Sequence, residues 1–175
     1  MFIYSLLYKI KYIDLNLIMS KVDEIIGKKE KANELLKKGE LHNAELAYKE
    51  ILNEIEKMNE EERKDSKIQE QRKLILSNLA MTLQKENKIK ESMECDKIII
   101  KKIDPTFAKS YARLIDNNLR MDRFNMARYH YDLMKQHVSQ DMISKFPEII
   151  QKVEKEIEKH DEMAKGLLML KDALK

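Results

Sequence analysis

The 175-residue chain is rich in charged (37%) and hydrophobic (43%) residues, and it contains only 3 Gly, 2 Pro and no Trp. So few turn residues exclude a strand-rich protein, and the abundance of Lys, Glu, Leu, Ile and Met predicts an all-α fold. The net charge of +3, from 34 basic and 31 acidic residues, is too balanced to indicate a nucleic-acid-binding protein.

The N-terminal extension, residues 1–20, begins with an apolar run that Lys9, Lys11 and Asp14 then interrupt. A membrane-spanning helix needs about 20 mostly apolar residues, and a signal peptide carries its positive charge before the apolar run. Neither pattern is present, so we expect no membrane partner. The segment is expected to be an added extension or a poorly ordered arm.

Helical periodicity predicts a series of helices joined by short turns. Gly39 is expected to end the first helix as a C-cap. Pro105 should close the fourth helix because its ring removes a hydrogen-bond donor, and Pro147 should open the last one. The predicted helices span residues 21–38, 41–57, 67–86, 89–103, 107–121, 124–137 and 147–174.

Three helical hairpins align with one another. In each, a small or apolar residue of the first helix is followed nine residues later by an apolar residue, and three residues after that by a small residue. The small residue that ends this pattern recurs after 48 residues from the first hairpin to the second, and after 35 residues from the second to the third. The excess in the first interval indicates an insertion near 58–70 with a solvated charged face. The aligned residues are Ala32, Leu41 and Ala44; Ala80, Ile89 and Ser92; and Ile115, Phe124 and Ala127.

This pattern resembles the tetratricopeptide repeat (TPR), a helical hairpin with a period of 34 residues. The matching stretches, 29–36, 77–81 and 108–113, are most similar to the TPR domains of immunophilin co-chaperones. The resemblance implies three hairpins over residues 21–138, stacked as a right-handed superhelix, and a long helix within 139–175 that caps the open end. The segment 165–171 leaves a second interpretation open, a partner site of the calmodulin-target type; we favour capping.

The resemblance also implies a binding site, the carboxylate clamp. Its pattern is Lys-x-x-x-Asn in the first helix of the first hairpin, Asn in that of the second, and Lys-x-x-x-Arg in that of the third. A peptide that ends in aspartate offers two carboxylates, which need cationic donors and amide groups. The i,i+4 spacing places two such side chains on one helix face. The alternative is that these residues are ordinary solvent-facing groups. The matching residues are Lys29, Asn33, Asn78, Lys109 and Arg113.

No other group of residues indicates catalysis, a cofactor or a metal site. Cys95, the single cysteine, excludes an intrachain disulfide, fits a reducing compartment and is expected to be a packed thiol. The 4 His are scattered without the spacing of metal ligands, and His130 and His137 are expected on an exposed helix face. Tyr111, Phe124, Tyr129 and Tyr131 follow helical spacing and are expected in the core.

The resemblance therefore implies a cytoplasmic adaptor, and not an enzyme, that binds the acidic C-terminal tail of heat-shock chaperones of the ninety-kilodalton or seventy-kilodalton class. That tail is of the Glu-Glu-Val-Asp type. Two alternatives stay open: a generic TPR scaffold for another protein complex, and the TPR part of a prolyl-isomerase immunophilin. If the clamp is present, replacing Lys109 or Arg113 is expected to weaken tail binding while leaving the fold intact.

Overall fold

The computed structural model describes residues 2–174, and the side chains of residues 17–172 and 174. All regular structure in that part of the chain is helical, which confirms the predicted all-α class. Each expected helix is present, and two short helices, α3 and α8, were not expected. The elements are α1 (Phe2–Lys37), α2 (Leu41–Lys57), α3 (Glu60–Lys64), α4 (Ser66–Lys85), α5 (Ile89–Ile98), the π-helix η1 (Ile99–Ile103), α6 (Ala108–Arg120), α7 (Phe124–His137), α8 (Gln140–Ile143) and α9 (Pro147–Ala173).

The first helix is longer than the sequence predicted. It already begins at Phe2, so the N-terminal extension is continuous with α1 from that residue on. Met1, and the side chains up to residue 16, lie outside the described residues. Among the helices that the structure describes, none combines the length and the apolar character needed to cross a membrane.

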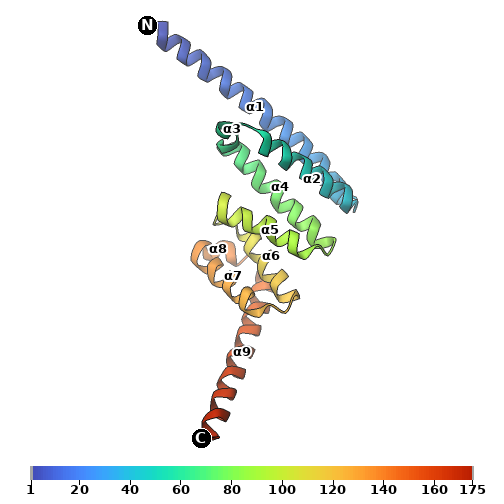
Figure 1. Cartoon of the computed structure of the whole chain (residues 1–175), viewed down its shortest axis with the longest axis vertical. Helices are drawn as coiled ribbons and strands as arrows, with labels where there is room; N and C mark the ends of the chain where they lie inside the picture. The colour runs from blue at the N-terminus through green and yellow to red at the C-terminus, as the bar shows by residue number, and fades with distance from the viewer. Residues whose placement is uncertain (1, 175) are drawn as a thin grey trace. The chain divides into compact units, whose positions relative to one another are not determined.

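The helices form two compact units, and the division falls inside α5, between Cys95 and Asp96. In the first unit α1 and α2 form a hairpin, and α4 packs against both (Figure 1). Small residues permit this close packing, because Ala32, Ala44 and Ala80 are all completely buried. In the same unit the hydroxyl of the buried Ser92 donates to the Ala80 carbonyl oxygen at 2.8 Å. The small residues that align in the sequence therefore lie where helices meet.

The first helices of the three hairpins, α1, α4 and α6, end in the same type of turn. Gly39, Asn87 and Asp122, which occupy equivalent positions of the repeat, have φ angles of 80°, 61° and 54°. The residue after each donates its backbone N–H to a carbonyl five residues back, as in Glu40 N to Leu35 O at 3.0 Å. This is the Schellman cap. The repetition seen in the sequence is thus present in the backbone geometry as well.

Replacing Asp122 with glycine is expected to raise the free energy of unfolding by about 0.5–1 kcal/mol. A side chain is strained at positive φ, whereas glycine adopts this conformation readily and is the usual residue at this cap position. Urea unfolding followed by circular dichroism measures the change. Gly39→Ala, which introduces a side chain at the equivalent position of α1, should lower the stability by about 1 kcal/mol. An Asp122→Gly variant no more stable than the parent would contradict this reasoning.

The charged stretch after α2 is largely helical. Helix α3 begins after Asn59, whose side-chain oxygen accepts a hydrogen bond from Glu62 N at 2.9 Å. Helix α4 begins after Asp65, whose carboxylate accepts a hydrogen bond from Lys67 N at 2.8 Å. Both are favourable N-caps, because a side-chain oxygen satisfies a backbone donor that the helix leaves unpaired. No residue of α3 is buried, so this segment is a solvated charged surface.

In the second unit α6 and α7 form a hairpin, with Ile115 and Ala127 completely buried. The π-helix η1 continues directly from α5. One turn of a π-helix takes up an extra residue compared with an α-helix. The interval from Ser92 to Ala127 is 35 residues, one more than the repeat period, and η1 lies inside it. The local π-helix therefore accommodates the additional residue without shifting the repeat.

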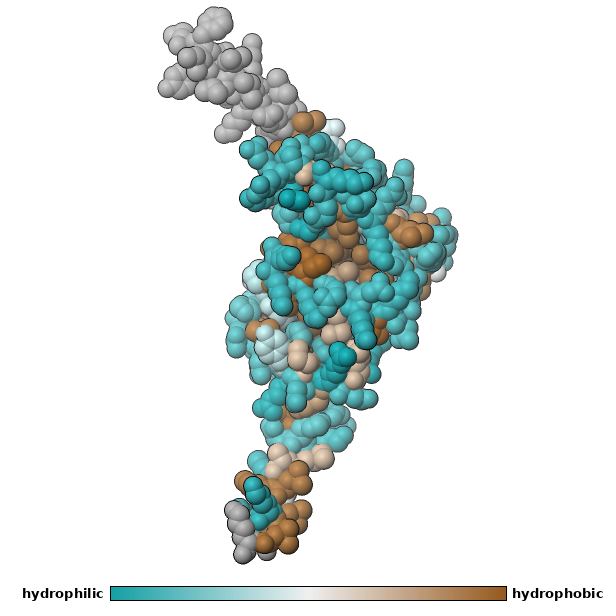
Figure 2. Space-filling view, viewed as in Figure 1, coloured by the Kyte–Doolittle hydropathy of each residue, from teal (hydrophilic) through white to brown (hydrophobic). Residues whose placement is uncertain are grey.

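Only the first half of α9 packs on α6 and α7. Val153 is completely buried there, and the His160 ring stacks on Phe124 with ring centroids 3.9 Å apart. Helix α9 therefore covers one side of the α6–α7 hairpin. The second half is exposed: between Leu167 and Leu170 each side chain is at least 61% exposed, and Figure 2 shows an apolar surface at this end of the chain. Contact with α6 and α7 does not account for this exposed apolar surface.

Candidate functional site

Two of the predicted site residues, Asn33 of α1 and Asn78 of α4, contact each other in the first unit. Asn78 Nδ2 donates a hydrogen bond to Asn33 Oδ1 at 2.8 Å, and the hydroxyl of Tyr48 on α2 donates to the same oxygen at 2.6 Å. Burial raises the pKa of Tyr48 to about 12, although the Asn78 amide opposes the rise, so the hydroxyl keeps its proton at neutral pH. Two internal donors therefore occupy the Asn33 oxygen, and its Nδ2 group has no partner among the described residues.

Lys29 lies one helical turn before Asn33 on α1, and its charge is not compensated by a carboxylate in the part of the chain that the structure describes. Its Nζ donates to Gln71 Oε1 on α4 at 2.6 Å, and an amide oxygen is a neutral acceptor. Gln71 and Asn78 are seven residues apart and therefore share one face of α4. The same faces of α1 and α4 thus carry a cation and three amides.

The other two predicted residues, Lys109 and Arg113, lie one turn apart on α6 in the second unit. Lys109 is exposed and has no partner among the described residues. Arg113 is mostly buried and binds Asp96 at two points, with Nε to Oδ2 and Nη2 to Oδ1 both at 2.8 Å. Complete burial raises the pKa of Asp96, and the Arg113 guanidinium opposes the rise. Arg113 is therefore engaged within its own unit, whereas Lys109 is not.

The five predicted residues thus form two groups, three in the first unit and two in the second. The sequence interpretation missed their partners Gln71, Tyr48 and Asp96. A signal for two of these was present in the repeat, because Tyr48 stands four residues after Ala44 and Asp96 stands four residues after Ser92. That spacing places each on the helix face that packs against neighbouring helices. No comparable signal marks Gln71.

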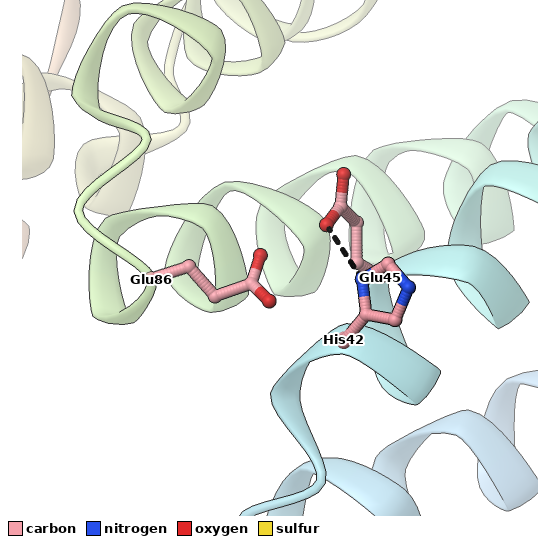
Figure 3. Close-up of side chains that lie close together, drawn as sticks. All are labelled: His42, Glu45 and Glu86. Carbon is pink, nitrogen blue, oxygen red and sulfur yellow. Dashed lines mark ion pairs between the residues drawn. The ribbon is translucent and has the colours of Figure 1, made fainter.

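A second polar cluster, which the sequence did not predict, joins α2 to the turn before α5. His42, Glu45 and Glu86 lie close together there (Figure 3), and Glu45 is buried. Lys49 Nζ donates to one Glu45 oxygen at 2.5 Å and Lys88 Nζ to the other at 2.6 Å. Burial tends to raise the pKa of Glu45, but the hydrogen bonds from the two lysines lower it to about 2. Ammonium groups thus occupy both oxygens of the charged carboxylate, and we interpret the cluster as an ion-pair network.

Two side chains of α7 correct the expectations from the sequence. His130 was expected on an exposed face but is buried, with Nδ1 2.7 Å from the Met126 carbonyl oxygen; burial lowers its pKa. Tyr129 was expected in the core but is 53% exposed. The reason is helical spacing, since Ala127, His130 and Met134 share the buried face of α7 and position 129 does not lie on it.

No family model matches the sequence, and no curated protein matches it. Among solved structures, the chain is similar to the C-terminal TPR-containing domain of an FK506-binding protein from Plasmodium falciparum. The sequence identity is 21% and the TM-score 0.58, and the match covers 81% of this chain and 95% of that one. The chain is also similar to the Sgt2 TPR domain from Aspergillus fumigatus, with 17% identity, a TM-score of 0.53 and coverage of 77% and 82%. The chain therefore has the fold of TPR domains.

Proposed function

We propose that this chain is a cytoplasmic protein-binding adaptor that holds the acidic C-terminal tail of a heat-shock chaperone. The tail is of the Glu-Glu-Val-Asp type, found on the ninety-kilodalton and seventy-kilodalton chaperones that bind co-chaperone TPR domains. Its last residue carries two carboxylates, one from the chain terminus and one from the side chain. On this proposal the chain acts by binding and not by catalysis. The residues proposed to bind the tail are Lys29, Asn33, Asn78, Lys109 and Arg113.

The main support is that Lys29 and Asn33, the two proposed site residues of α1, are held by neutral partners. Lys29 is bound by the amide oxygen of Gln71, and Asn33 by a tyrosine hydroxyl and another amide. A carboxylate partner in the protein would compensate the charge of Lys29 and compete with a ligand. Neutral partners orient the side chain and leave its positive charge for an anionic ligand. Lys109, exposed and without a partner among the described residues, meets the same requirement.

The orientation of the amides fits the same ligand. Because the Asn33 oxygen already accepts two hydrogen bonds, this side chain offers a ligand only its Nδ2 donor. An ionised carboxylate is an acceptor without donors, so a fixed amide donor suits it and a fixed amide oxygen would repel it. A generic polar surface has no need of this arrangement.

Two alternatives predict different behaviour. A generic TPR scaffold would bind a partner protein without requiring a free C-terminal carboxylate. The TPR part of a prolyl-isomerase immunophilin would bind the chaperone tail and would be joined to a catalytic domain. The similarity to a TPR-containing domain of an FK506-binding protein keeps the second alternative in view, and an isomerase domain encoded in the same transcript would support it.

Titration calorimetry with a free-acid Glu-Glu-Val-Asp peptide and its C-terminally amidated twin tests the proposal. We expect micromolar affinity for the free acid, about −8 kcal/mol, and binding at least about tenfold weaker for the amide, because a charge-assisted hydrogen bond contributes about 1.5–3 kcal/mol. Affinity for the free acid should also fall as salt is added, since screening acts over about 8 Å at physiological ionic strength. Equal affinity for the two peptides would contradict the proposal and favour the generic scaffold.

A further inference from the structure

One position is polar and buried in the second helix of every hairpin. It lies four residues after the small residue that marks the repeat in α2, α5 and α7, and it is occupied by Tyr48, Asp96 and Tyr131, with exposed fractions of 0%, 0% and 6%. Each of these side chains makes a polar contact with another helix. Asp96 binds Arg113 of α6, and the Tyr131 hydroxyl donates to Glu154 of α9. The position therefore serves as a polar support for the neighbouring helix.

In the first hairpin this support acts on Asn33, one of the residues proposed to bind the tail. The Tyr48 hydroxyl and Asn78 Nδ2 both donate to Asn33 Oδ1. We infer that Tyr48 is a positioning residue of the carboxylate site, which directs the Asn33 amide donor toward the ligand without touching the ligand itself. This inference rests on the proposed function and adds to it a residue outside the five clamp positions.

The physical reason is the two-sided character of an amide group, which has an acceptor on one side and donors on the other. With Tyr48 present, rotating the Asn33 amide by half a turn would place its Nδ2 group against the Asn78 donor, and that hydrogen bond would be lost. The Tyr48 hydroxyl could then accept from Asn33 Nδ2, but its own hydrogen would lose the Asn33 oxygen to which it now donates. Without the hydroxyl only the Asn78 contact opposes this rotation. A rotated Asn33 would present its oxygen to a carboxylate, which repels it.

The repeat provides a matched pair of variants. Tyr48→Phe and Tyr131→Phe each remove one hydroxyl from the same position of a hairpin and leave the ring in place, but only Tyr48 contacts a proposed tail-binding residue. We expect Tyr48→Phe to weaken binding of the free-acid peptide about fivefold, and Tyr131→Phe to leave it unchanged, while both variants lose a little thermal stability. Equal affinity of the two variants for the peptide would overturn the inference, because a purely structural hydroxyl would affect stability alone.

A measurement without peptide separates this inference from the proposed function. The side-chain amide resonances of Asn33, observed by NMR in the free protein, should shift and broaden in Tyr48→Phe and keep their parent positions in Tyr131→Phe. If the parent does not distinguish the free-acid from the amidated peptide, the proposed function fails, and positioning for that ligand fails with it. If the parent does distinguish them but the Asn33 resonances are the same in both variants, the proposed function stands and the role of Tyr48 is refuted.

Discussion

Replacing Arg113 with alanine is expected to lower the free energy of unfolding by about 3–5 kcal/mol, the cost of leaving a buried charge without its partner. Asp96 is completely buried, and both of its oxygens accept hydrogen bonds from the Arg113 guanidinium. The sequence interpretation expected such a variant to keep the parent fold intact, since it treated Arg113 as an exposed charge that faces the ligand. The ion pair with Asp96 replaces that expectation. Urea unfolding monitored by circular dichroism measures the loss.

The matched control is Arg120→Ala on the same helix. Arg120 pairs with Asp116 at 2.7 Å, but its side chain is 54% exposed, so its loss should change the stability by no more than about 1 kcal/mol. Adding Asp96→Asn to Arg113→Ala should restore part of the stability, because the buried group is then neutral. If Arg113→Ala were no less stable than Arg120→Ala, the pair would not have the structural role described above.

The instability of Arg113→Ala should also depend on pH. Burial already raises the pKa of Asp96 in the parent, and losing the guanidinium removes the main group that opposes this rise. A carboxyl group whose pKa is higher in the folded than in the unfolded state destabilises the fold when the pH is above its folded-state pKa. This cost disappears as the pH falls toward the unfolded-state pKa, which is about 3.9 for aspartate. The difference between parent and variant should therefore shrink on acidification. A constant or growing difference would argue against an unpaired Asp96 as the cause.

Replacing Lys109 with alanine is expected to weaken binding of the free-acid peptide about thirtyfold, a cost of about 2 kcal/mol, and to leave the stability of the fold unchanged. Lys109 is exposed and has no partner among the described residues, so its removal leaves no buried group unsatisfied. Removal does leave a peptide carboxylate without a cation. Lys109 therefore separates binding from folding, which Arg113 does not.

Lys101→Ala is the control for this test, since Lys101 is also exposed and lies in η1, outside the clamp pattern. Calorimetric titration of both variants with the free-acid peptide, beside a thermal unfolding curve for each, gives the comparison. If Lys109→Ala and Lys101→Ala bind as tightly as the parent, the clamp hypothesis is wrong for the second unit, and a generic TPR scaffold becomes the better description.

The amino-acid sequence by itself determined the helices and their repetition. These depend on local signals: the cap at Gly39, the helix start at Pro147, and small residues at a constant spacing. Each of these signals acts on the backbone within a few residues. Each can therefore be recognised in the sequence without knowing what packs against it. Even the additional residue of the second repeat was visible in the spacing, although only the structure assigned it to η1.

Only the tertiary structure decided which polar side chains meet. The sequence treated Arg113 and Lys109 alike, yet one is bound to a buried carboxylate and the other is exposed. It likewise gave no indication that Tyr48 bonds Asn33. Such pairs join residues that are 15 or 17 positions apart, and a chain with 65 charged residues among 175 offers many equivalent candidates for each contact. The packing of the helices selects among them, because burial makes an unpaired polar group costly.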